Sequence, residues 1–457
     1  MATKEFPLVP EAVAPVETKY RKIATKIPVP ESIEHLEKLR TIEPRSMGGQ
    51  PPILWHHGDG FTVSDPYGNT WLDFSAGVLV TACGHNRPEI VNAIQDMAEN
   101  GMYHTYAFPT MVRVKLVEAI SKLLPDPLKR VFLLSTGAEA TECCIKLART
   151  RGMAIGGARK NIVVSFENAF HGRTMGSQLA GGSPALKEWI GGEDPRFVQV
   201  PFPDGFRQKD TRFEVFLKTL EARGVDPKNV CGVISETYQG CNAKLMPAEY
   251  AQALRKWCDE NQAVMIFDEV QAGFGRTGKM FGFMHFGVVP DLVACGKGVS
   301  GGMPLSAVLG TEELMNIYGP GEMTSTHSAN AVCAAAALAN IEVILKEKLV
   351  ENAAKLESVL SEGCERIVAA ANGKIGKWDC AGLVGAVQFT KPGTTQSDPD
   401  SAWELVKRAY QRGIMLFAPV GVGGCAVKIN PPLVITEDAL REGIDVLVEC
   451  AREVGSM

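Results

Sequence analysis

Residues 291–312 have the sequence DLVACGKGVSGGMPLSAVLGTE, and between the first and last acids the only charged side chain is Lys297. A glycine flanks this lysine on each side, and the apolar run 292–295 precedes it. Lysine is almost never fully buried without a partner. A single ammonium group in a stretch otherwise suited to burial therefore indicates either a side chain that extends to the surface or a lysine with a chemical role.

Further apolar stretches on the N-terminal side of Lys297 have the length and composition of buried β-strands. They lie at residues 130–135, 161–166, 231–236 and 263–269. Sequences with helical spacing, such as 248–261, separate them. Strands that are apolar on both faces and alternate with helices are typical of a parallel sheet covered on both sides. The sequence therefore predicts an α/β fold with a mainly parallel sheet in a large domain.

The sequence outside this pattern predicts three regions. Residues 1–75 are expected to form an N-terminal arm and a hairpin (around 61–74) that pack on a smaller domain. Residues 76–335 form the large domain, and residues 336–457 form a smaller α+β domain. One long helix over 329–360 is expected where the two domains join.

Composition excludes several classes of protein. The 457 residues carry a net charge of −5 without a basic block, so no nucleic-acid surface is expected. No segment approaches the length and apolarity of a membrane span, and the N-terminus lacks the apolar core of a signal peptide. The twelve cysteines contain no C-x-x-C pair and the eight histidines no H-E-x-x-H, so neither a disulfide framework nor a metal site is expected. These features predict a cytoplasmic protein whose partners are small molecules and copies of itself.

Residues 273–278, GFGRTG, match the dinucleotide pattern G-x-G-x-x-G literally. That pattern requires a strand directly before the first glycine and a helix after the third, and neither is expected here. The near match to a phosphate-binding P-loop fails as well, because Met280 stands where a hydroxyl group would bind magnesium. Dehydrogenase and nucleotide-hydrolase functions are therefore not expected.

Polar side chains gather where the predicted strands end. In parallel sheets, ligands bind at the carboxyl ends of the strands. The residues at these ends are the turn 135–141, the loop residues Phe170, His171 and Arg173, then Glu236, Asp268, Glu269 and Lys297. A tight turn into a helix offers free N–H groups to a phosphate, although a plain helix cap would have the same sequence.

This set of residues suits pyridoxal phosphate (PLP). Lysine forms Schiff bases with carbonyl groups when desolvation lowers its pKa, and Lys297 is placed for that role. PLP also needs a carboxylate at its pyridine nitrogen, which Asp268 offers, and an anion site for its phosphate. On this reasoning alone, a sugar-phosphate site or an aldolase-like lysine site is an equally good interpretation.

Residues 265–308 resemble the signature of the class III (ω-amino acid) PLP-dependent aminotransferases. Residues 135–149, STGAEATECCIKLAR, and 168–174, NAFHGRT, are similar to other blocks of that family in the same order. The resemblance extends from about Trp55 to the C-terminus, and within the family it points to 4-aminobutyrate aminotransferases. It implies a fold type I homodimer that binds PLP at an active site between the subunits.

The resemblance also implies roles for individual residues. Lys297 would bind the cofactor covalently and move the proton, and Asp268 would pair with the pyridine nitrogen. The other cofactor contacts would be Val270 beneath the ring, Phe170 above it, Gln271 at the ring hydroxyl, and Gly137, Ala138 and Thr326 of the partner subunit at the phosphate.

On the substrate side, Arg173 matches the arginine that binds the distal carboxylate of 4-aminobutyrate, and Val78 matches a residue of the pocket wall. Glu236 matches an acid that pairs with an arginine of the C-terminal domain. Here Lys428 stands where the family has that arginine. Lysine lacks the planar fork that binds a carboxylate with two hydrogen bonds, so the exchange is not conservative.

The sequence therefore predicts a transaminase that moves an amino group from an ω-amino acid to a 2-keto acid by a ping-pong mechanism. Class III folds also host racemases, epimerases and amine lyases, and the changes around Glu236, Thr326 and Lys428 keep these alternatives open. A binding protein without catalysis is disfavoured, because Lys297 and Asp268 are both present.

Overall fold

The computed structural model describes residues 4–191 and 194–457, which divide into two compact units. Unit 1 combines the chain up to Arg87 with Asn352–Met457, and unit 2 is the continuous segment Pro88–Glu351. The predicted domain limits before residues 76 and 336 stay predictions. No helix of the described residues is long and apolar enough to cross a membrane.

The core of unit 2 is a seven-stranded sheet. In spatial order its strands are β6 (Arg130–Leu134), β14 (Ser306–Gly310), β13 (Leu292–Cys295), β12 (Val264–Asp268), β9 (Val230–Glu236), β7 (Ile162–Phe166) and β8 (Phe197–Val200). β14 runs antiparallel to both of its neighbours, whereas β13, β12, β9, β7 and β8 are mutually parallel. The mainly parallel sheet is confirmed, and β14 is a strand that the sequence analysis did not identify.

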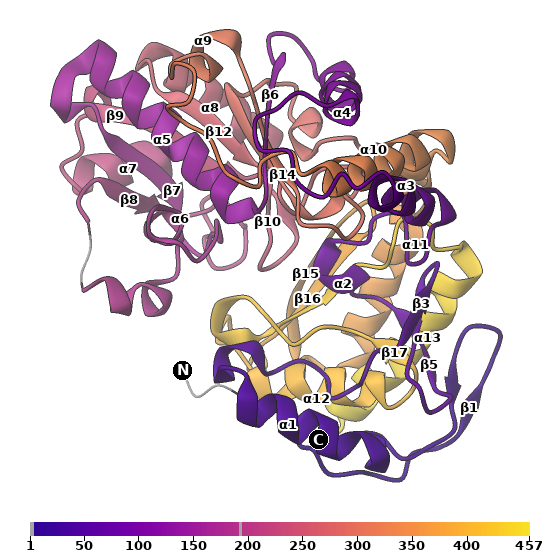
Figure 1. The fold of residues 1–457 in the computed structure, drawn as a ribbon. Coiled ribbons are helices and arrows are strands. Elements are labelled where there is room, and N and C mark those ends of the chain that lie inside the picture. The colour runs from indigo at the N-terminus through magenta and orange to yellow at the C-terminus, as the bar shows by residue number, and fades with distance from the viewer. Residues whose placement is uncertain (1–3, 192–193) are drawn as a thin grey trace. The chain divides into compact units, whose positions relative to one another are not determined.

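Helices cover this sheet on both faces (Figure 1). The helices of unit 2 are α3 (Pro88–Glu99), α4 (Met111–Lys122), α5 (Gly137–Gly156), α6 (Met175–Ala180), α7 (Glu214–Ala222), α8 (Ala248–Glu260), α9 (Glu312–Met315) and α10 (Ala331–Lys346). On one face, small residues of α5 such as Ala140 and Ala148 pack against Ile234 and Ile266. On the other face, rings fill the space, among them Phe166 against Tyr250 of α8. Close packing on both faces explains why the strands are apolar throughout.

Unit 1 brings the two ends of the chain into one set of sheets. A six-stranded sheet contains β1 (Val16–Glu17), β2 (Lys22–Ile23), β3 (His57–Asp59), β4 (Thr62–Ser64), β5 (Thr70–Asp73) and β17 (Ile414–Met415). A three-stranded sheet contains β15 (Ile375–Ala381), β16 (Val384–Phe389) and β18 (Ala426–Ile429). The helices are α1 (Ile33–Ile42), α2 (Ala76–Leu79), α11 (Leu349–Ala370), α12 (Pro399–Tyr410) and α13 (Glu437–Gly455). β4 and β5 are antiparallel neighbours, which confirms the predicted hairpin.

The single helix predicted over 329–360 is wrong. The structure contains two helices, α10 and α11, and Lys348 between them has a φ of +53°. This left-handed conformation cannot continue a right-handed helix. The segment contains neither glycine nor proline, so the sequence carries no signal for the break.

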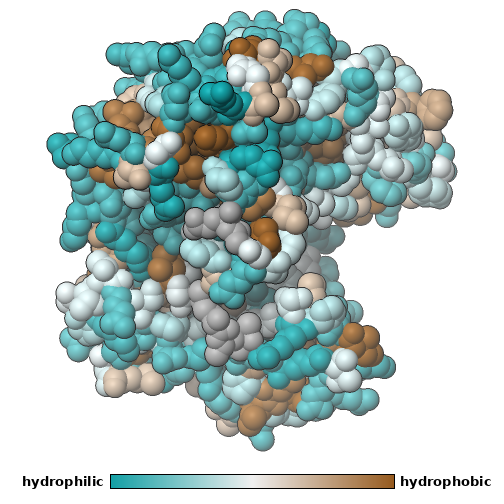
Figure 2. Space-filling view, turned by 90° about the vertical axis from the view of Figure 1, so that its left-hand side faces the viewer, coloured by the Kyte–Doolittle hydropathy of each residue, from teal (hydrophilic) through white to brown (hydrophobic). Residues whose placement is uncertain are grey.

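Exposed apolar residues differ in how closely they gather. Figure 2 shows one face of the molecule on which hydrophilic side chains predominate and hydrophobic ones gather in separate small groups. The exposed large apolar side chains nevertheless include a run in one short segment of unit 2, residues 102–114, with Phe108 at 74% exposure.

Candidate active site

The parallel register of unit 2 brings the predicted acids and the lysine to one edge of the sheet. Asp268, the last residue of β12, lies opposite Glu236 of β9 on one side and Ala294 of β13 on the other. Lys297 follows Ala294 by three residues and begins a short 3-10 turn, Lys297–Val299. The strands therefore place Glu236, Asp268 and Lys297 at their common carboxyl edge, as the sequence predicted.

Asp268 is held by hydrogen bonds to both of its carboxylate oxygens. Its Oδ2 lies 2.8 Å from Nδ1 of His171, and its Oδ1 accepts a bond of 2.9 Å from the N–H of Val270. The aspartate is buried, with 5% of its surface exposed. These contacts fix the orientation of the carboxylate at the strand end.

His171 is a site residue to which the sequence analysis assigned no role. It is buried, its carbonyl accepts a 2.7 Å bond from the Thr141 hydroxyl, and its Nε2 has no partner among the described residues. Burial lowers the pKa of His171, but the hydrogen bond and charge of Asp268 raise it by more, so the net pKa is raised. The position next to Phe170 in the sequence did not reveal this contact, because nothing local links it to Asp268.

Lys297 is partly buried, and its ammonium has no hydrogen-bond or ion-pair partner in the described part of the chain. Burial lowers its pKa below the ordinary value of 10.5, while the charges of Asp268 and Glu236 oppose that shift. A lysine with a lowered pKa carries more of the neutral amine at a given pH, and the neutral amine is the nucleophilic form. A lowered pKa at this position is compatible with the role predicted for Lys297.

Glu236 accepts hydrogen bonds from two backbone N–H groups. Its Oε2 accepts from the N–H of Phe170 at 3.1 Å, and its Oε1 accepts from the N–H of Gly240 at 2.9 Å. Burial raises its pKa to about 7, with His171 opposing and Asp268 adding to the shift. Its carboxyl group therefore changes charge near neutral pH.

The first turn of α5 lies at the position where an anion site was predicted. The Thr136 hydroxyl accepts from the N–H of Glu139 at 3.1 Å, and the Glu139 carboxylate accepts from the N–H groups of Ser135 and Thr136. This capping box leaves the N–H groups of Gly137 and Ala138 without an acceptor in the described chain. Free N–H groups at a helix N-terminus bind phosphate well.

Space is tight where this turn meets the strand ends. A Cβ atom on Gly137 would lie 2.9 Å from Cγ1 of Val270, and one on Gly296 would lie 3.2 Å from the same atom. The anion site, Val270 and the residue before Lys297 are therefore in direct contact. Gln271 is fixed nearby, with the Tyr238 hydroxyl 3.4 Å from its Oε1.

Phe170 and Arg173 lie at the surface of the same edge. The ring of Phe170 is 38% exposed, and the guanidinium carbon of Arg173 lies 5.5 Å from its centroid. An exposed ring with a cation beside it can stack on a flat ligand and bind an anionic group at its border.

The three remaining predicted residues are Thr326 in unit 2 and Val78 and Lys428 in unit 1. Thr326 is exposed, and its neighbour Ser325 donates a 2.9 Å bond to Glu139 of the same chain. Val78 belongs to unit 1, is 42% exposed, and lies in a turn in which Ala76, Gly77, Val78 and Leu79 all have positive φ. Lys428, on β18 of unit 1, is buried and faces Ala386 of β16 in register.

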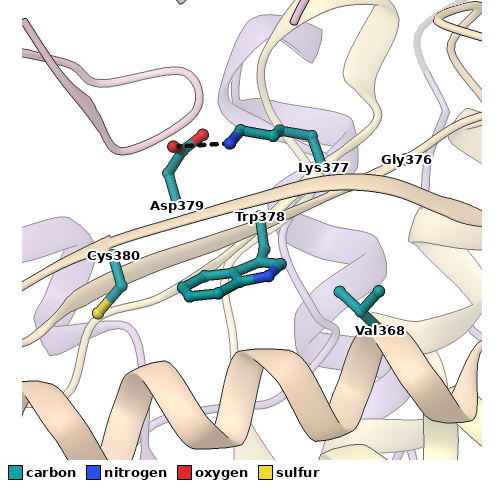
Figure 3. A pocket seen from close by; sticks show the side chains of 6 residues that line it. All are labelled: Val368, Gly376, Lys377, Trp378, Asp379 and Cys380. Atoms are coloured by element: carbon teal, nitrogen blue, oxygen red, sulfur yellow. Dashed lines mark ion pairs between the residues drawn. The ribbon is translucent and has the colours of Figure 1, made fainter. Parts of the chain in front are cut away.

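A cavity of about 520 Å³ lies in unit 1 along β15. Figure 3 shows Lys377 and Asp379 on one side of this strand, while Trp378 points toward the adjacent helix, where Val368 lies. The lysine and the aspartate pair with each other at 3.4 Å. Lys297 and Asp268 belong to unit 2, so this cavity is not the site built by the strand ends.

The strand-end residues of unit 2 fit PLP. The helix turn offers two free N–H groups for the phosphate, the oriented Asp268 carboxylate suits the pyridine nitrogen, and Lys297 offers an unbonded amine. Phe170 and Val270 provide apolar surfaces for the ring. Fold and site thus define a PLP-dependent enzyme of fold type I.

Comparisons with known proteins identify the family. Residues 45–451 match the model of aminotransferase class-III, so the chain belongs to the class III aminotransferases and is PLP-dependent. It is 33% identical to a 4-aminobutyrate aminotransferase of Mycobacterium leprae, over 93% of this chain and 97% of that protein. It is 32% identical to an acetylornithine aminotransferase of Caldanaerobacter subterraneus subsp. tengcongensis, over 88% and 95%. The ornithine aminotransferase of Toxoplasma gondii superposes with a TM-score of 0.82 at 25% identity, covering 93% of this chain and 95% of that one.

Proposed function

We propose that this aminotransferase takes the amino group from an ω-amino acid of the 4-aminobutyrate type and transfers it to a 2-keto acid by a ping-pong cycle. The observation that carries the proposal is the position of Arg173, whose guanidinium lies beside the exposed Phe170 ring at the edge that contains Lys297. A cation there suits the carboxylate at the far end of an ω-amino acid. The similarity to a 4-aminobutyrate aminotransferase supports the same substrate class.

When bound, PLP supplies the electron sink that makes a proton on the substrate carbon acidic. In the proposed cycle Lys297 Nζ accepts that proton from the substrate carbon and delivers it to the cofactor. Its lowered pKa favours the neutral amine, which is the form that accepts a proton. Asp268, oriented by His171, would pair with the pyridine nitrogen. The remaining cofactor contacts in this proposal are Gly137, Ala138, Phe170, Val270, Gln271, and Thr326 of the partner subunit.

In this proposal Glu236 and Lys428 adjust the substrate site between the two half-reactions, and Val78 forms part of the pocket wall. The Glu236 carboxyl has a pKa raised to about 7, so a modest change in its surroundings alters its charge. Lys428 presents a point charge, whereas the planar guanidinium of an arginine would bind an α-carboxylate with two hydrogen bonds.

We expect Lys428→Arg to raise kcat/KM for 2-oxoglutarate by about tenfold, the equivalent of one charge-assisted hydrogen bond. An unchanged value in steady-state kinetics would place acceptor binding elsewhere.

A half-reaction without acceptor tests the proposed function. A transaminase mixed with its amino donor converts the visible band of the lysine-bound cofactor stoichiometrically into the near-ultraviolet band of the cofactor's amino form. A series of ω-amino acids, with α-amino acids of equal length as controls, identifies the donor. Release of ammonia without conversion would indicate an amine lyase. Exchange of the α-hydrogen with solvent without conversion would indicate a racemase.

The proposal includes a homodimer with the active site between its subunits. The exposed apolar run at 102–114 includes Tyr103, Phe108 and Met111, each more than 60% exposed. Exposed apolar groups of this kind mark interaction surfaces. We expect light scattering to give twice the mass of the chain, and Phe108→Glu together with Met111→Glu to give monomers with little activity. A double variant that stays dimeric would exclude this segment from the interface.

We also propose a reducing, cytoplasmic location. All twelve cysteines are free thiols, and most of them are buried. Free buried cysteine in this number suits a compartment that keeps thiols reduced. Cell fractionation with an antibody against the chain tests this placement.

A further inference from the structure

The turn that carries Lys297 has a strained backbone. Lys297 itself has a φ of +43°, which is uncommon for a residue with a side chain. Few bonds within the turn support it: the N–H of Val299 lies 3.2 Å from the Gly296 carbonyl oxygen, and the N–H of Ser300 lies 3.5 Å from that of Lys297. Such a conformation costs about 1–3 kcal/mol and persists only where the surroundings hold it. Something outside the turn must therefore keep Lys297 in place.

Asn340 of α10 provides that contact. Its side-chain Nδ2 donates to the carbonyl oxygens of Gly298 at 2.9 Å and Val299 at 3.1 Å, the two residues that follow Lys297. Asn340 is completely buried. One amide group thus bridges two consecutive carbonyls of the turn, which fixes the direction of the backbone at Lys297.

The surroundings of Asn340 show a close fit between helix and turn. A Cβ atom on Gly301 would lie 2.8 Å from the Asn340 Oδ1, and Gly301 itself has a φ of +66°. The buried residues of α10 around Asn340 are otherwise apolar, including Ala336, Ala337 and Ile344. An amide in such a setting is costly unless it is hydrogen-bonded.

We infer that Asn340 is a positioning residue, which acts through the backbone of Gly298 and Val299 to hold the Lys297 amine at the carboxyl edge of the sheet. The inference rests on the proposed role of Lys297 and adds a residue that touches neither cofactor nor substrate. The amide is neutral, so it leaves the charges that face Lys297, those of Asp268 and Glu236, unchanged.

A purely structural role is the competing explanation. In that case loss of the amide would leave two buried carbonyls without a donor and lower stability by about 1–3 kcal/mol each, and nothing else would change. A positioning role adds an effect on Lys297 itself. When the turn relaxes, the amine reaches water more easily, and its pKa rises toward the ordinary value.

The test compares Asn340→Leu, which keeps the volume and removes the donors, with Ala337→Gly, which weakens the same buried helix without touching the amide. In the cofactor-free chain, the pH dependence of Lys297 modification by an amine-reactive reagent is followed by peptide mass spectrometry. We expect Asn340→Leu to shift this profile upward by about 0.5–1 pH unit, on the scale of ordinary pKa perturbations. Ala337→Gly should leave it unchanged.

In the holoenzyme, kcat of Asn340→Leu should fall by about 10–100-fold with little change in KM, since a small displacement of a reacting group has effects of that size. Asn340→Ser retains one donor and should recover part of both properties; it also serves if the leucine variant does not fold. An Asn340→Leu profile and kcat that match those of Ala337→Gly would overturn the inference. If instead Lys297→Met keeps the visible band, the proposed role of Lys297 fails, whatever the Asn340 variants show.

Discussion

Two lysines lie at opposite edges of the same sheet, and their surroundings differ. Lys160 precedes β7 at the amino edge, and its ammonium donates to the carbonyls of Lys228 at 3.1 Å and Asn261 at 2.7 Å. Lys297 follows β13 at the carboxyl edge and has no such bonds in the described residues. Burial lowers the pKa of each lysine. A lowered pKa alone therefore does not distinguish the two lysines, whereas their hydrogen bonding does.

The same substitution at each lysine gives the largest expected contrast. Lys297→Met should abolish the visible band of the bound cofactor and reduce kcat/KM by at least about 100–10,000-fold, because it removes the group that moves the proton. Absorbance spectroscopy and steady-state assays measure these effects. A variant that keeps the band would disprove the assignment of Lys297.

Lys160→Met should act on stability instead. The change removes the donor for two carbonyls at the amino edge, which should lower the free energy of unfolding by about 1–3 kcal/mol, while the visible band stays intact. Urea unfolding of the two methionine variants under identical conditions makes the comparison. Loss of the visible band in Lys160→Met, or a lower stability of Lys297→Met than of Lys160→Met, would contradict a structural role for Lys160 and a chemical role for Lys297.

Glu236 gives the smallest and most specific effect at the carboxyl edge. Its pKa in the folded chain, about 7, exceeds the ordinary 4.5. The folded state thus binds more protons than the unfolded state between these values, so this group contributes less stability as the pH rises from 4.5 through 7. Glutamine does not titrate, so we compare the Tm of Glu236→Gln with that of the wild type at two pH values. The Tm of the variant minus the Tm of the wild type should be about 2–4 °C larger at pH 8 than at pH 5.

Calorimetry of the cofactor-free chain measures this difference. The same change at the exposed Glu449 serves as the control and should leave the pH dependence as it is in the wild type. Parallel pH profiles for the wild type and Glu236→Gln would show that the raised pKa of Glu236 does not contribute to stability.

The sequence predicted those features that depend on local pattern. Apolar runs located several strands, and Asp268 at the end of β12 and Lys297 shortly after β13 fell at one edge because parallel strands share a direction. The sequence analysis did not identify β14, and an apolar run would not have shown its antiparallel direction, since it looks the same in either orientation. The break at Lys348 lacked a glycine or proline to mark it.

Contacts between segments distant in sequence could not be predicted from the sequence either. His171 lies 97 residues from Asp268, and Asn340 lies 42 residues from Gly298. A histidine after a phenylalanine in a loop, or an asparagine in an alanine-rich helix, gives no sign of its partner until the chain has folded. Family resemblance did not supply these two residues either, because it transfers only positions with a known role.

The division of the chain has a consequence for its synthesis. Unit 2 is one continuous segment, whereas unit 1 needs both ends of the chain, for example where β5 at Leu72 pairs with β17 at Ile414. On the ribosome, the first 87 residues emerge long before their strand partners exist. Domains fold as units during translation, so unit 2 can complete its core while the edges of the amino-terminal strands are still unpaired. The nascent chain is therefore most open to chaperones, and to mispairing with other chains, through its first segment rather than through its catalytic sheet.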